Sequence, residues 1–262
     1  MRVQLHDFAM EYEDKANGTP LLFIHGYPLN RTLWEPQFAL SDAARVIAPD
    51  LPGHGMSDPV ATAQTMDTYA EDLHQLLDVI GARQPAVVCG LSMGGYVAFA
   101  FYRKYASRVR GLIFAATKAG ADSAEGKAGR DKSAATAKEK GASAIAEAML
   151  PKMFAPKTYQ MNPALVARAK AMMESTPVAG IVGDLMGMRD RPDSTPTLAQ
   201  INVPTLVLHG ADDQLIPSKE AEATHAGIKN SKLVLVPEAG HLLNLEQPDA
   251  FNRAVREFLK SL

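Results

Sequence analysis

The centre of this 262-residue sequence is a short apolar run that ends in a glycine-rich turn, Val87-Val88-Cys89-Gly90-Leu91-Ser92-Met93-Gly94-Gly95. Residues 86–89 have the length and the β-branched side chains of a buried strand, and the residues after Ser92 have helical character. Ser92 is therefore predicted to lie in the turn between a strand and a helix. Gly90 and Gly94, two residues on either side of Ser92, carry no side chain that would obstruct such a sharp reversal.

The G-x-S-x-G pattern of residues 90–94 indicates chemistry at Ser92. In a nucleophile elbow, a strained turn raises the serine hydroxyl above the sheet, and the following N–H, here that of Met93, faces the same space. A glycine-rich turn with an incidental serine is the alternative interpretation. The flanking strand and helix favour the elbow.

The composition indicates one α/β domain that contains an insertion. A chain of 262 residues, 47% of them hydrophobic, can bury a large core, and we expect one core rather than two independent domains. Its 27 basic and 29 acidic residues give a net charge of -2, so neither nucleic acid nor an anionic membrane is expected as a partner. Cys89 is the only cysteine and lies in an apolar strand, so we expect it to be buried and unreactive.

The sequence lacks signals for targeting and for bound groups. Residues 1–7 lack the apolar segment of a signal peptide, and no run approaches the ~20 apolar residues of a membrane span. We therefore expect a cytoplasmic protein. No spacing of His, Asp and Cys suggests a metal site, and the glycine-rich segments lack both a Walker lysine and G-x-G-x-x-G, so we expect neither a metal nor a cofactor.

Strand and helix signals alternate along the chain. Short antiparallel strands are expected within residues 3–12, and Asn17-Gly18 is a hairpin signal. Thr68-Tyr69-Ala70-Glu71 matches a capping box at the start of a helix that Gly81 ends. Continuously apolar strands are predicted at residues 21–24, 46–48, 86–89, 112–115, 204–210 and 232–236. This alternation predicts an α/β fold with a mostly parallel, doubly wound sheet and helices on both faces.

Residues 118–195 interrupt this pattern. They carry no strand signal, are rich in Ala, Lys, Gly and Met, and have helical stretches at residues 134–149 and 163–174. We predict that they form a helical cap inserted into a core of residues 1–117 and 196–262. The methionines of the insertion are expected either to line an adaptable apolar surface or to pack the insertion's own small core.

Residues suited to acyl transfer follow three of the predicted strands. Ser92 follows one strand, the pair Asp212 and Asp213 follows another, and His241 follows the last. A serine hydroxyl needs a base to remove its proton, and a carboxylate must hold that base in the right tautomer. In doubly wound sheets such groups gather beyond the carboxyl ends of the strands. The order Ser, Asp, His along the chain is therefore consistent with a catalytic triad.

With these segments in view, the sequence resembles the α/β-hydrolases, the large group that contains carboxylesterases, lactonases, cofactor-free haloperoxidases and pimeloyl-carrier-protein methyl esterases. The match covers residues 20–117 and 200–262, and residues 118–195 carry no family motif. The matching motifs are His25-Gly26-Tyr27-Pro28, Asp50-Leu51-Pro52-Gly53-His54-Gly55-Met56-Ser57, Gly90-Leu91-Ser92-Met93-Gly94-Gly95, Gly210-Ala211-Asp212-Asp213-Gln214-Leu215-Ile216-Pro217, and Gly240-His241 followed by Glu246 and Pro248.

The resemblance implies a role for each of these motifs. It implies that Ser92 is the nucleophile, that His241 is the base, and that the N–H groups of Tyr27 and Met93 form the oxyanion hole. The family pattern has a glycine, the acid three residues later and a proline four residues beyond it, which selects Asp213 rather than its neighbour.

The expected function is a serine hydrolase that cleaves small neutral carboxylic esters through an acyl-enzyme. A lactonase or cofactor-free perhydrolase with the same triad is the alternative within enzymes, and a ligand receptor without turnover is the alternative from another class. The acyl pocket is expected to be apolar and to reject charged acids, because burying an unpaired charge is costly. Its predicted lining residues are Leu29, Leu215, Ile216, Leu242, Met149, Met153, Met172 and Met186.

Overall fold

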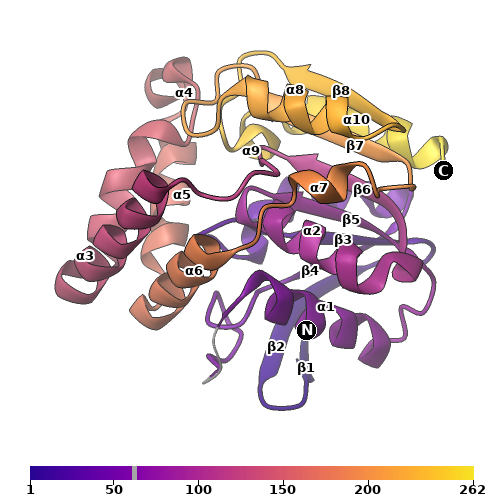
Figure 1. Ribbon diagram of the computed structural model, residues 1–262, viewed down its shortest axis with the longest axis horizontal. Helices are drawn as coiled ribbons and strands as arrows, with labels where there is room; N and C mark the ends of the chain where they lie inside the picture. The colour runs from indigo at the N-terminus through magenta and orange to yellow at the C-terminus, as the bar shows by residue number, and fades with distance from the viewer. Residues whose placement is uncertain (61–63) are drawn as a thin grey trace.

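The computed structural model describes residues 1–60 and 64–262, and this part of the chain builds an eight-stranded sheet with helices on both faces (Figure 1). The strands are β1 (Arg2–Gln4), β2 (Ala9–Lys15), β3 (Pro20–Ile24), β4 (Arg45–Pro49), β5 (Ala86–Leu91), β6 (Val109–Ala115), β7 (Thr205–Gly210) and β8 (Ser231–Val236). The helices are α1 (Met66–Val79), α2 (Met93–Tyr105), α3 (Ala124–Met149), α4 (Pro156–Met161), α5 (Pro163–Glu174), α6 (Val178–Asp190), α7 (Thr195–Leu198), α8 (Ser218–Gly227), α9 (Leu243–Glu246) and α10 (Pro248–Lys260).

The strand order β1-β2-β4-β3-β5-β6-β7-β8 confirms a mostly parallel sheet. The strands β4, β3, β5, β6, β7 and β8 pair in parallel, whereas β2 pairs antiparallel with both β1 and β4. All carboxyl ends of the parallel strands therefore meet at one edge of the sheet, where ligands bind in such folds.

The hairpin expected at Asn17-Gly18 is wrong. The chain does turn there, with φ 117° at Gly18, but the flanking strands β2 and β3 are not neighbours, because β4 lies between them. Val46, Ile47 and Ala48 of β4 are fully buried, so this strand is covered on both faces and paired along both edges. The local turn signal specified a reversal of the chain and carried no information on which strands pair.

Apolar side chains pack on both faces of the sheet, so the core expected from the composition forms two layers. Along β3, Leu22 and Ile24 point to the face covered by α1 and α2. Leu21 and Phe23 point to the other face, which α10 and the 3₁₀ helix Arg31–Asp42 cover. These layers fix the sheet from both sides and leave its carboxyl edge free for polar loops.

Helix α1 begins three residues before the predicted capping box. Thr65 is its N-cap: the Thr65 hydroxyl accepts a hydrogen bond from the Thr68 N–H at 3.0 Å, and the Thr65 N–H donates to the Thr68 hydroxyl at 2.8 Å. Thr68 thus completes the box from the third helical position, so the expected box at residues 68–71 is misplaced. Gly81, with φ 71°, follows the end of the helix as predicted.

Five helices, α3 to α7, connect β6 to β7, and Figure 1 shows α3, α4, α5 and α6 gathered on one side of the sheet. α5 has the bounds expected from the sequence, whereas α3 begins ten residues before the predicted start because Ser123 caps it, accepting from the Gly126 N–H at 3.2 Å. α3 is interrupted at Gly141, where φ is 79° and ψ is -176°. In the described ranges no helix is long and apolar enough to cross a membrane.

A buried polar contact joins α6 to the loop after β4. The Asp184 carboxylate on α6 lies 2.9 Å from Nε2 of His54 and accepts a hydrogen bond from the Tyr69 hydroxyl on α1. His54 Nδ1 lies 2.9 Å from the carbonyl oxygen of Leu29. Both ring nitrogens of His54 therefore lie close to oxygen atoms, an arrangement that favours the protonated ring. Burial opposes this charge, but Asp184 outweighs it and raises the pKa of His54.

Replacing Asp184 by Asn should lower the free energy of unfolding by about 3 kcal/mol, because the buried His54 ring and the buried Tyr69 hydroxyl lose the carboxylate that both of them contact. The matched control is Asp190→Asn, which changes an exposed aspartate at the last residue of the same helix and should alter stability by less than about 0.5 kcal/mol. Urea denaturation of the full chain measures both values. Equal stabilities of the two variants would show that the contact does not anchor α6.

Candidate active site

Ser92 lies in a strained turn between β5 and α2. Its backbone has φ 55° and ψ -114°, a conformation that costs a residue with a side chain of order 1–3 kcal/mol. The turn is held by close backbone approaches: a Cβ on Gly90 would lie 2.1 Å from the Gly94 carbonyl oxygen, and a Cβ on Gly94 would lie 2.2 Å from that of Ile24. The Thr117 hydroxyl donates to the Ser92 carbonyl at 2.8 Å. The Ser92 side chain is half-buried and faces a cavity.

His241 and Asp213 form a buried pair in the loops after β8 and β7. Nδ1 of His241 lies 2.9 Å from Oδ2 of Asp213, and the side chains are 1% and 0% exposed. Oδ1 of Asp213 accepts the N–H groups of Leu215 at 2.8 Å and Ile216 at 3.0 Å. Burial opposes ionisation, but His241 and these bonds outweigh it and lower the pKa of Asp213. The ionised carboxylate fixes the proton on Nδ1 and leaves Nε2 able to accept one.

The neighbouring Asp212 does not join this pair. Its side chain is exposed, while its N–H donates to the carbonyl oxygen of Ala239 at 2.9 Å. His209, by contrast, is buried with Nε2 3.5 Å from Oδ2 of Asp213 and 2.9 Å from the Ile216 carbonyl oxygen. Its position at the end of β7, four residues before Asp213, is the signal that could have indicated this contact.

The N–H groups of Tyr27 and Met93 donate to no backbone acceptor among residues 1–60 and 64–262. Met93 is the first residue of α2, so its N–H has no carbonyl four residues earlier within the helix. Tyr27 lies in the loop after β3, which the buried His25 holds: Nδ1 donates to the Gly26 carbonyl at 3.0 Å and Nε2 accepts the Leu51 N–H at 3.0 Å. Burial and the nearby His54 keep the pKa of His25 well below its ordinary value, so this ring is neutral.

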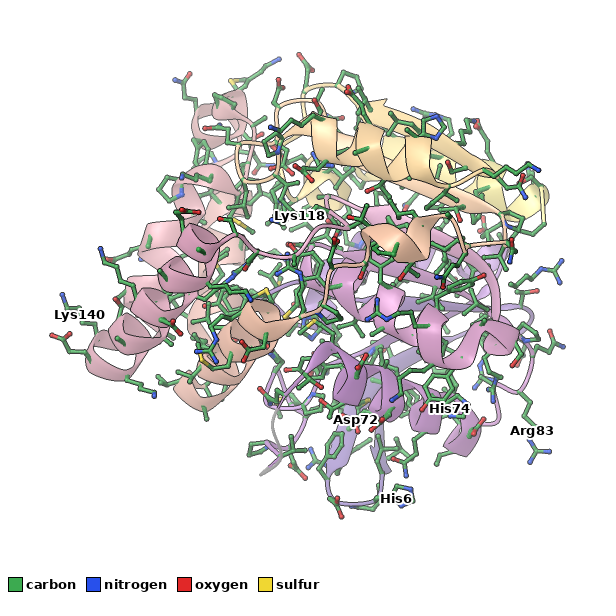
Figure 2. All side chains as sticks on the ribbon, viewed as in Figure 1. His6, Asp72, His74, Arg83, Lys118 and Lys140 are labelled. Carbon is green, nitrogen blue, oxygen red and sulfur yellow. The ribbon has the colours of Figure 1, made fainter. Side chains whose placement is uncertain are left out.

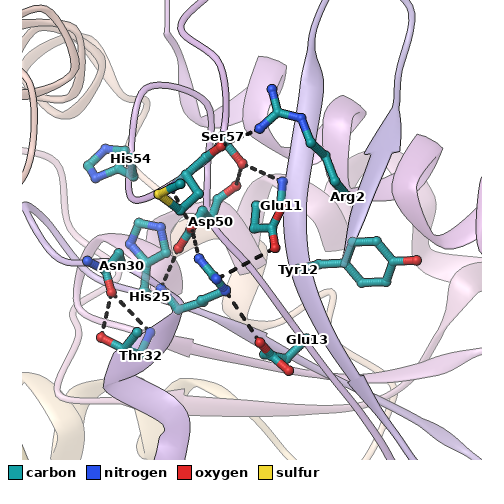
Figure 3. Close-up of polar contacts among 12 residues, drawn as sticks. Arg2, Glu11, Tyr12, Glu13, His25, Asn30, Thr32, Asp50, His54 and Ser57 are labelled. Atoms are coloured by element: carbon teal, nitrogen blue, oxygen red, sulfur yellow. Dashed lines mark hydrogen bonds and ion pairs between the residues drawn. The ribbon is translucent and has the colours of Figure 1, made fainter.

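Asp50 ties the same loop to the sheet (Figure 3). Its buried carboxylate forms an ion pair with the Arg31 guanidinium and accepts the N–H groups of Arg31 at 2.7 Å and Met56 at 2.8 Å. The Ser57 hydroxyl donates to the Asp50 carbonyl oxygen at 2.8 Å. Figure 3 shows these contacts between β2 and the loops that follow β3 and β4. The loop that carries the Tyr27 N–H is therefore held by these polar contacts as well as by the packing of its buried side chains Tyr27 and Leu29.

Glu246 of α9 holds the loop that carries His241. Its carboxylate accepts the Gly240 N–H at 2.6 Å, the Ala155 N–H at 2.8 Å and the Thr158 hydroxyl at 2.6 Å. Ala155 and Thr158 belong to the segment between β6 and β7, so one carboxylate connects that segment to the loop after β8.

A cavity of about 290 Å³ opens at the carboxyl edge of the sheet. Its wall combines strand-end loops of the sheet with α3 and α6, and consists of Tyr27, Ser92, Tyr96, Lys118, Arg130, Ser133, Ile145, Ala148, Met149, Leu185, Met188, Leu215, Ile216, Pro217 and Glu220. Among the described residues no group of three His, Cys, Asp or Glu side chains is arranged to hold a metal ion.

Of the eight predicted pocket residues, three line this cavity, namely Met149, Leu215 and Ile216. The other five are corrections. The side chains of four of them point into the apolar layer beneath the 3₁₀ helix and α10, namely Leu29, Leu242, Met153 and Met172. Met186 instead lines a separate hollow beside Pro59 and Gly183. For Met172 on α5 and Met186 on α6, the direction of the side chain on its helix, which no periodicity in the sequence specified, decided the position.

The expectation of an uncharged cavity wall is also wrong, because Lys118, Arg130 and Glu220 line it. Lys118 follows the end of β6 by three residues, so the strand-end argument applied to Ser92 and His241 could have found it. Arg130 lies on α3, where its orientation toward the cavity depends on how that helix packs.

A parallel sheet with a strained serine after β5, an aspartate after β7 and a histidine bound to it after β8 defines the class of α/β hydrolases. The sequence profile described as "alpha/beta hydrolase fold" matches residues 19–248. This chain belongs to the α/β-hydrolase fold family.

Three proteins named for an enzymatic activity are similar to this chain along nearly its whole length. The structure of a thermophilic esterase from Thermogutta terrifontis, with malate bound, is 40% identical, has a TM-score of 0.97, and aligns over 100% of this chain and 98% of that one. The 3-oxoadipate enol-lactonase 2 of Acinetobacter baylyi is 29% identical over 257 residues, 97% of this chain and 94% of that protein. A putative non-heme chloroperoxidase of Synechocystis is 30% identical, over 95% of this chain and 94% of that protein.

The Gly90→Ala variant should lose the serine turn, because its Cβ would lie 2.1 Å from the Gly94 carbonyl oxygen and neither backbone can yield cheaply. We expect a loss of at least about 3 kcal/mol in stability, measured by urea denaturation. Gly129→Ala is the matched control: it lies on α3 with no atom within 4 Å of its Cβ, and alanine there should raise stability by up to ~1 kcal/mol. A Gly90 variant as stable as the wild type would contradict the close approach.

Proposed function

We propose that this chain is a serine hydrolase that cleaves small carboxylic esters through an acyl-enzyme, with Ser92 as nucleophile, His241 as base and Asp213 as the orienting acid. The observation that carries the proposal is the buried 2.9 Å contact between His241 and Asp213 at the sheet edge to which the strained Ser92 turn also belongs. Membership of the α/β-hydrolase family and similarity to an esterase support it.

In the proposed reaction, Nε2 of His241 takes the proton of the Ser92 hydroxyl while the oxygen attacks the ester carbonyl. The N–H groups of Tyr27 and Met93 donate to the oxyanion that forms, and each such donor is worth about 3 kcal/mol. The alcohol leaves with the proton from His241. Water then attacks the acyl group with the same histidine as base, which releases the acid and restores the serine.

We propose that residues 118–195 act as a helical cap on a core of residues 1–117 and 196–262. Support comes from the cavity wall, to which α3 contributes Arg130 and Met149 and α6 contributes Leu185, beside Ser92 from the sheet. A cap in this position would set substrate preference, since its side chains would contact whatever part of the substrate extends away from the serine.

Lactone hydrolysis is a second candidate activity, because a lactone is a cyclic ester and the proposed residues would open it by the same steps. Similarity to the enol-lactonase of Acinetobacter baylyi favours it. A cofactor-free perhydrolase is favoured in the same way by the chloroperoxidase relative. Multiple turnover of an aryl ester would separate all three enzymes from a receptor that only binds its ligand.

Ser92→Ala should leave the chain folded and lower ester turnover by roughly 10⁴-fold or more, because no other group supplies the attacking oxygen. An organophosphate should label the wild type on Ser92 and should fail to label this variant, as read by mass spectrometry. Ser133→Ala is the matched control, since Ser133 lines the same cavity and its loss should not prevent labelling. A phosphonyl group on any residue other than Ser92 would refute the assignment.

Asp213→Asn should lower kcat by roughly 10⁴-fold, because an amide in place of the carboxylate favours the wrong tautomer of His241. Asp212→Asn changes the adjacent, exposed aspartate and should cost less than tenfold. Steady-state kinetics on a short aryl ester compares the two variants directly. Similar losses in both, or a larger loss at Asp212, would remove Asp213 from the proposed triad.

A further inference from the structure

Four ionised side chains meet at one wall of the cavity, between the end of β6 and α3. The Asp122 carboxylate lies 3.4 Å from the Lys118 ammonium, 3.0 Å from Nε of Arg130 and 3.0 Å from the Arg191 guanidinium. Burial opposes the charge of Asp122, but the hydrogen bonds and charges of Arg191 and Arg130 lower its pKa to about 2. One negative charge therefore faces three positive charges.

Of the three cations, Arg191 is the one that is buried together with Asp122 and hydrogen-bonded to backbone carbonyl groups. Its side chain is 3% exposed, donates to the carbonyl oxygens of Met188 at 2.7 Å and Gly120 at 2.9 Å, and lies 4.0 Å from the centre of the Tyr96 ring. The charge of Asp122 is therefore neutralised by Arg191. The positive charges of Lys118 and Arg130 have no second carboxylate within the cluster to balance them.

Lys118 and Arg130, the two remaining cations, both line the cavity that contains Ser92. Arg130 uses only Nε on Asp122, and its two terminal nitrogens make no hydrogen bond to any residue in the described ranges. The side chain of Lys118 is 27% exposed and that of Arg130 is 25% exposed, so bulk water screens these two charges only in part. The opposing carboxylate in the wall is Glu220 of α8, a single negative charge against these two.

The wall contains one more hydrogen-bond donor, the hydroxyl group of Tyr27. Tyr27 lines the cavity and is only 5% exposed. Its hydroxyl is buried and forms no hydrogen bond within residues 1–60 and 64–262. Burial and Asp184 raise the pKa of this phenol, and the Arg130 charge opposes that rise. An unsatisfied buried hydroxyl costs about 1–3 kcal/mol, and a ligand oxygen bound near Arg130 would remove this cost.

We propose that the cavity binds esters that carry a second, ionised carboxylate, and that Arg130, Lys118 and the Tyr27 hydroxyl hold that carboxylate. This inference rests on the proposed ester hydrolysis at Ser92 and names its substrate class as half-esters of short dicarboxylic acids, or their equivalents with the carboxylate on the alcohol side. The volume of about 290 Å³ limits such substrates to a few carbons between the two groups. A carboxylate forms charge-assisted hydrogen bonds with a guanidinium, whereas a neutral acyl chain leaves the terminal nitrogens of Arg130 without an acceptor and the excess positive charge of the wall uncompensated.

Figure 2 shows the positions of two lysines of residues 118–195, one in the cavity wall and one on the outer surface. Lys118 lies where the segment after β6 meets the helices of residues 118–195, whereas Lys140 extends from α3 away from the rest of the molecule. Lys140 is exposed, so Lys140→Met serves as the matched control for the removal of one positive charge from α3.

The test compares kcat/KM for charged esters and for neutral esters of the same shape. One pair is ethyl hydrogen glutarate and ethyl 5-methylhexanoate, and the other, with the carboxylate on the alcohol side, is carboxymethyl butyrate and isobutyl butyrate. In at least one pair the wild type should prefer the charged ester at least tenfold. Arg130→Met should reduce that preference at least tenfold, Lys118→Met should reduce it by a smaller factor, and Lys140→Met should retain it.

A wild type that hydrolyses the neutral ester of both pairs as well as the charged one would overturn the inference and leave the esterase proposal intact. A preference that survives in both Arg130→Met and Lys118→Met would do the same. If Arg130→Met does not fold, Arg130→Lys and a rise from 0.05 to 0.5 M salt take its place, because screening should lower kcat/KM only for the charged esters. Hydrolysis of none of the four esters, with no organophosphate label on Ser92, would instead reject the proposed function itself.

Discussion

The close approach of α2 to the ends of β3 and β5 is the constraint on which the rest of the site depends. The crossing leaves no space for a side chain at Gly90 or Gly94, which lie two positions before and two positions after the strained Ser92. The same crossing places the start of α2 close to the loop that carries Tyr27, since a Cβ on Gly94 would lie 2.8 Å from the His25 carbonyl oxygen. The backbone of Ser92 and the two N–H groups proposed as oxyanion donors are thus positioned by backbone contacts.

Around this fixed turn, the loops are held by buried ionised and polar groups. Asp50 anchors the loop after β3, Asp184 joins α6 to His54, and Glu246 links the His241 loop to the segment before α4. Buried carboxylates of this kind are costly unless their oxygens have partners; Asp50 and Glu246 each accept several hydrogen bonds, and Asp184 accepts one from Tyr69 and lies 2.9 Å from His54. Such contacts are directional, so they fix loop geometry more closely than apolar packing would.

The sequence predicted those parts of the molecule that local patterns determine. Continuous apolar runs predicted the parallel strands, and the G-x-S-x-G turn predicted the strand-turn-helix around Ser92. The hairpin at Asn17-Gly18 was wrong because strand pairing is a long-range choice, made here by the fully buried β4. The prediction of the residues that line the cavity failed for a similar reason. The packing of the segment between β6 and β7 directs Met153 and Met172 into the core and Arg130 to the cavity. A single sequence records the side chains of those helices but not their rotation about the helix axis.

The charges of the cavity also bear on the chemistry proposed at Ser92. A substrate carboxylate and the developing oxyanion would be two negative charges in one small cavity, and at a separation of about 7 Å they would repel by roughly 2 kcal/mol at an effective dielectric constant of ~20. Without compensation this repulsion would raise the barrier for a charged ester above that for a neutral one. Lys118 and Arg130 lie in the same wall and offset it. Cations that recognise the carboxylate thereby also stabilise the transition state, so their effect belongs to kcat as well as to KM.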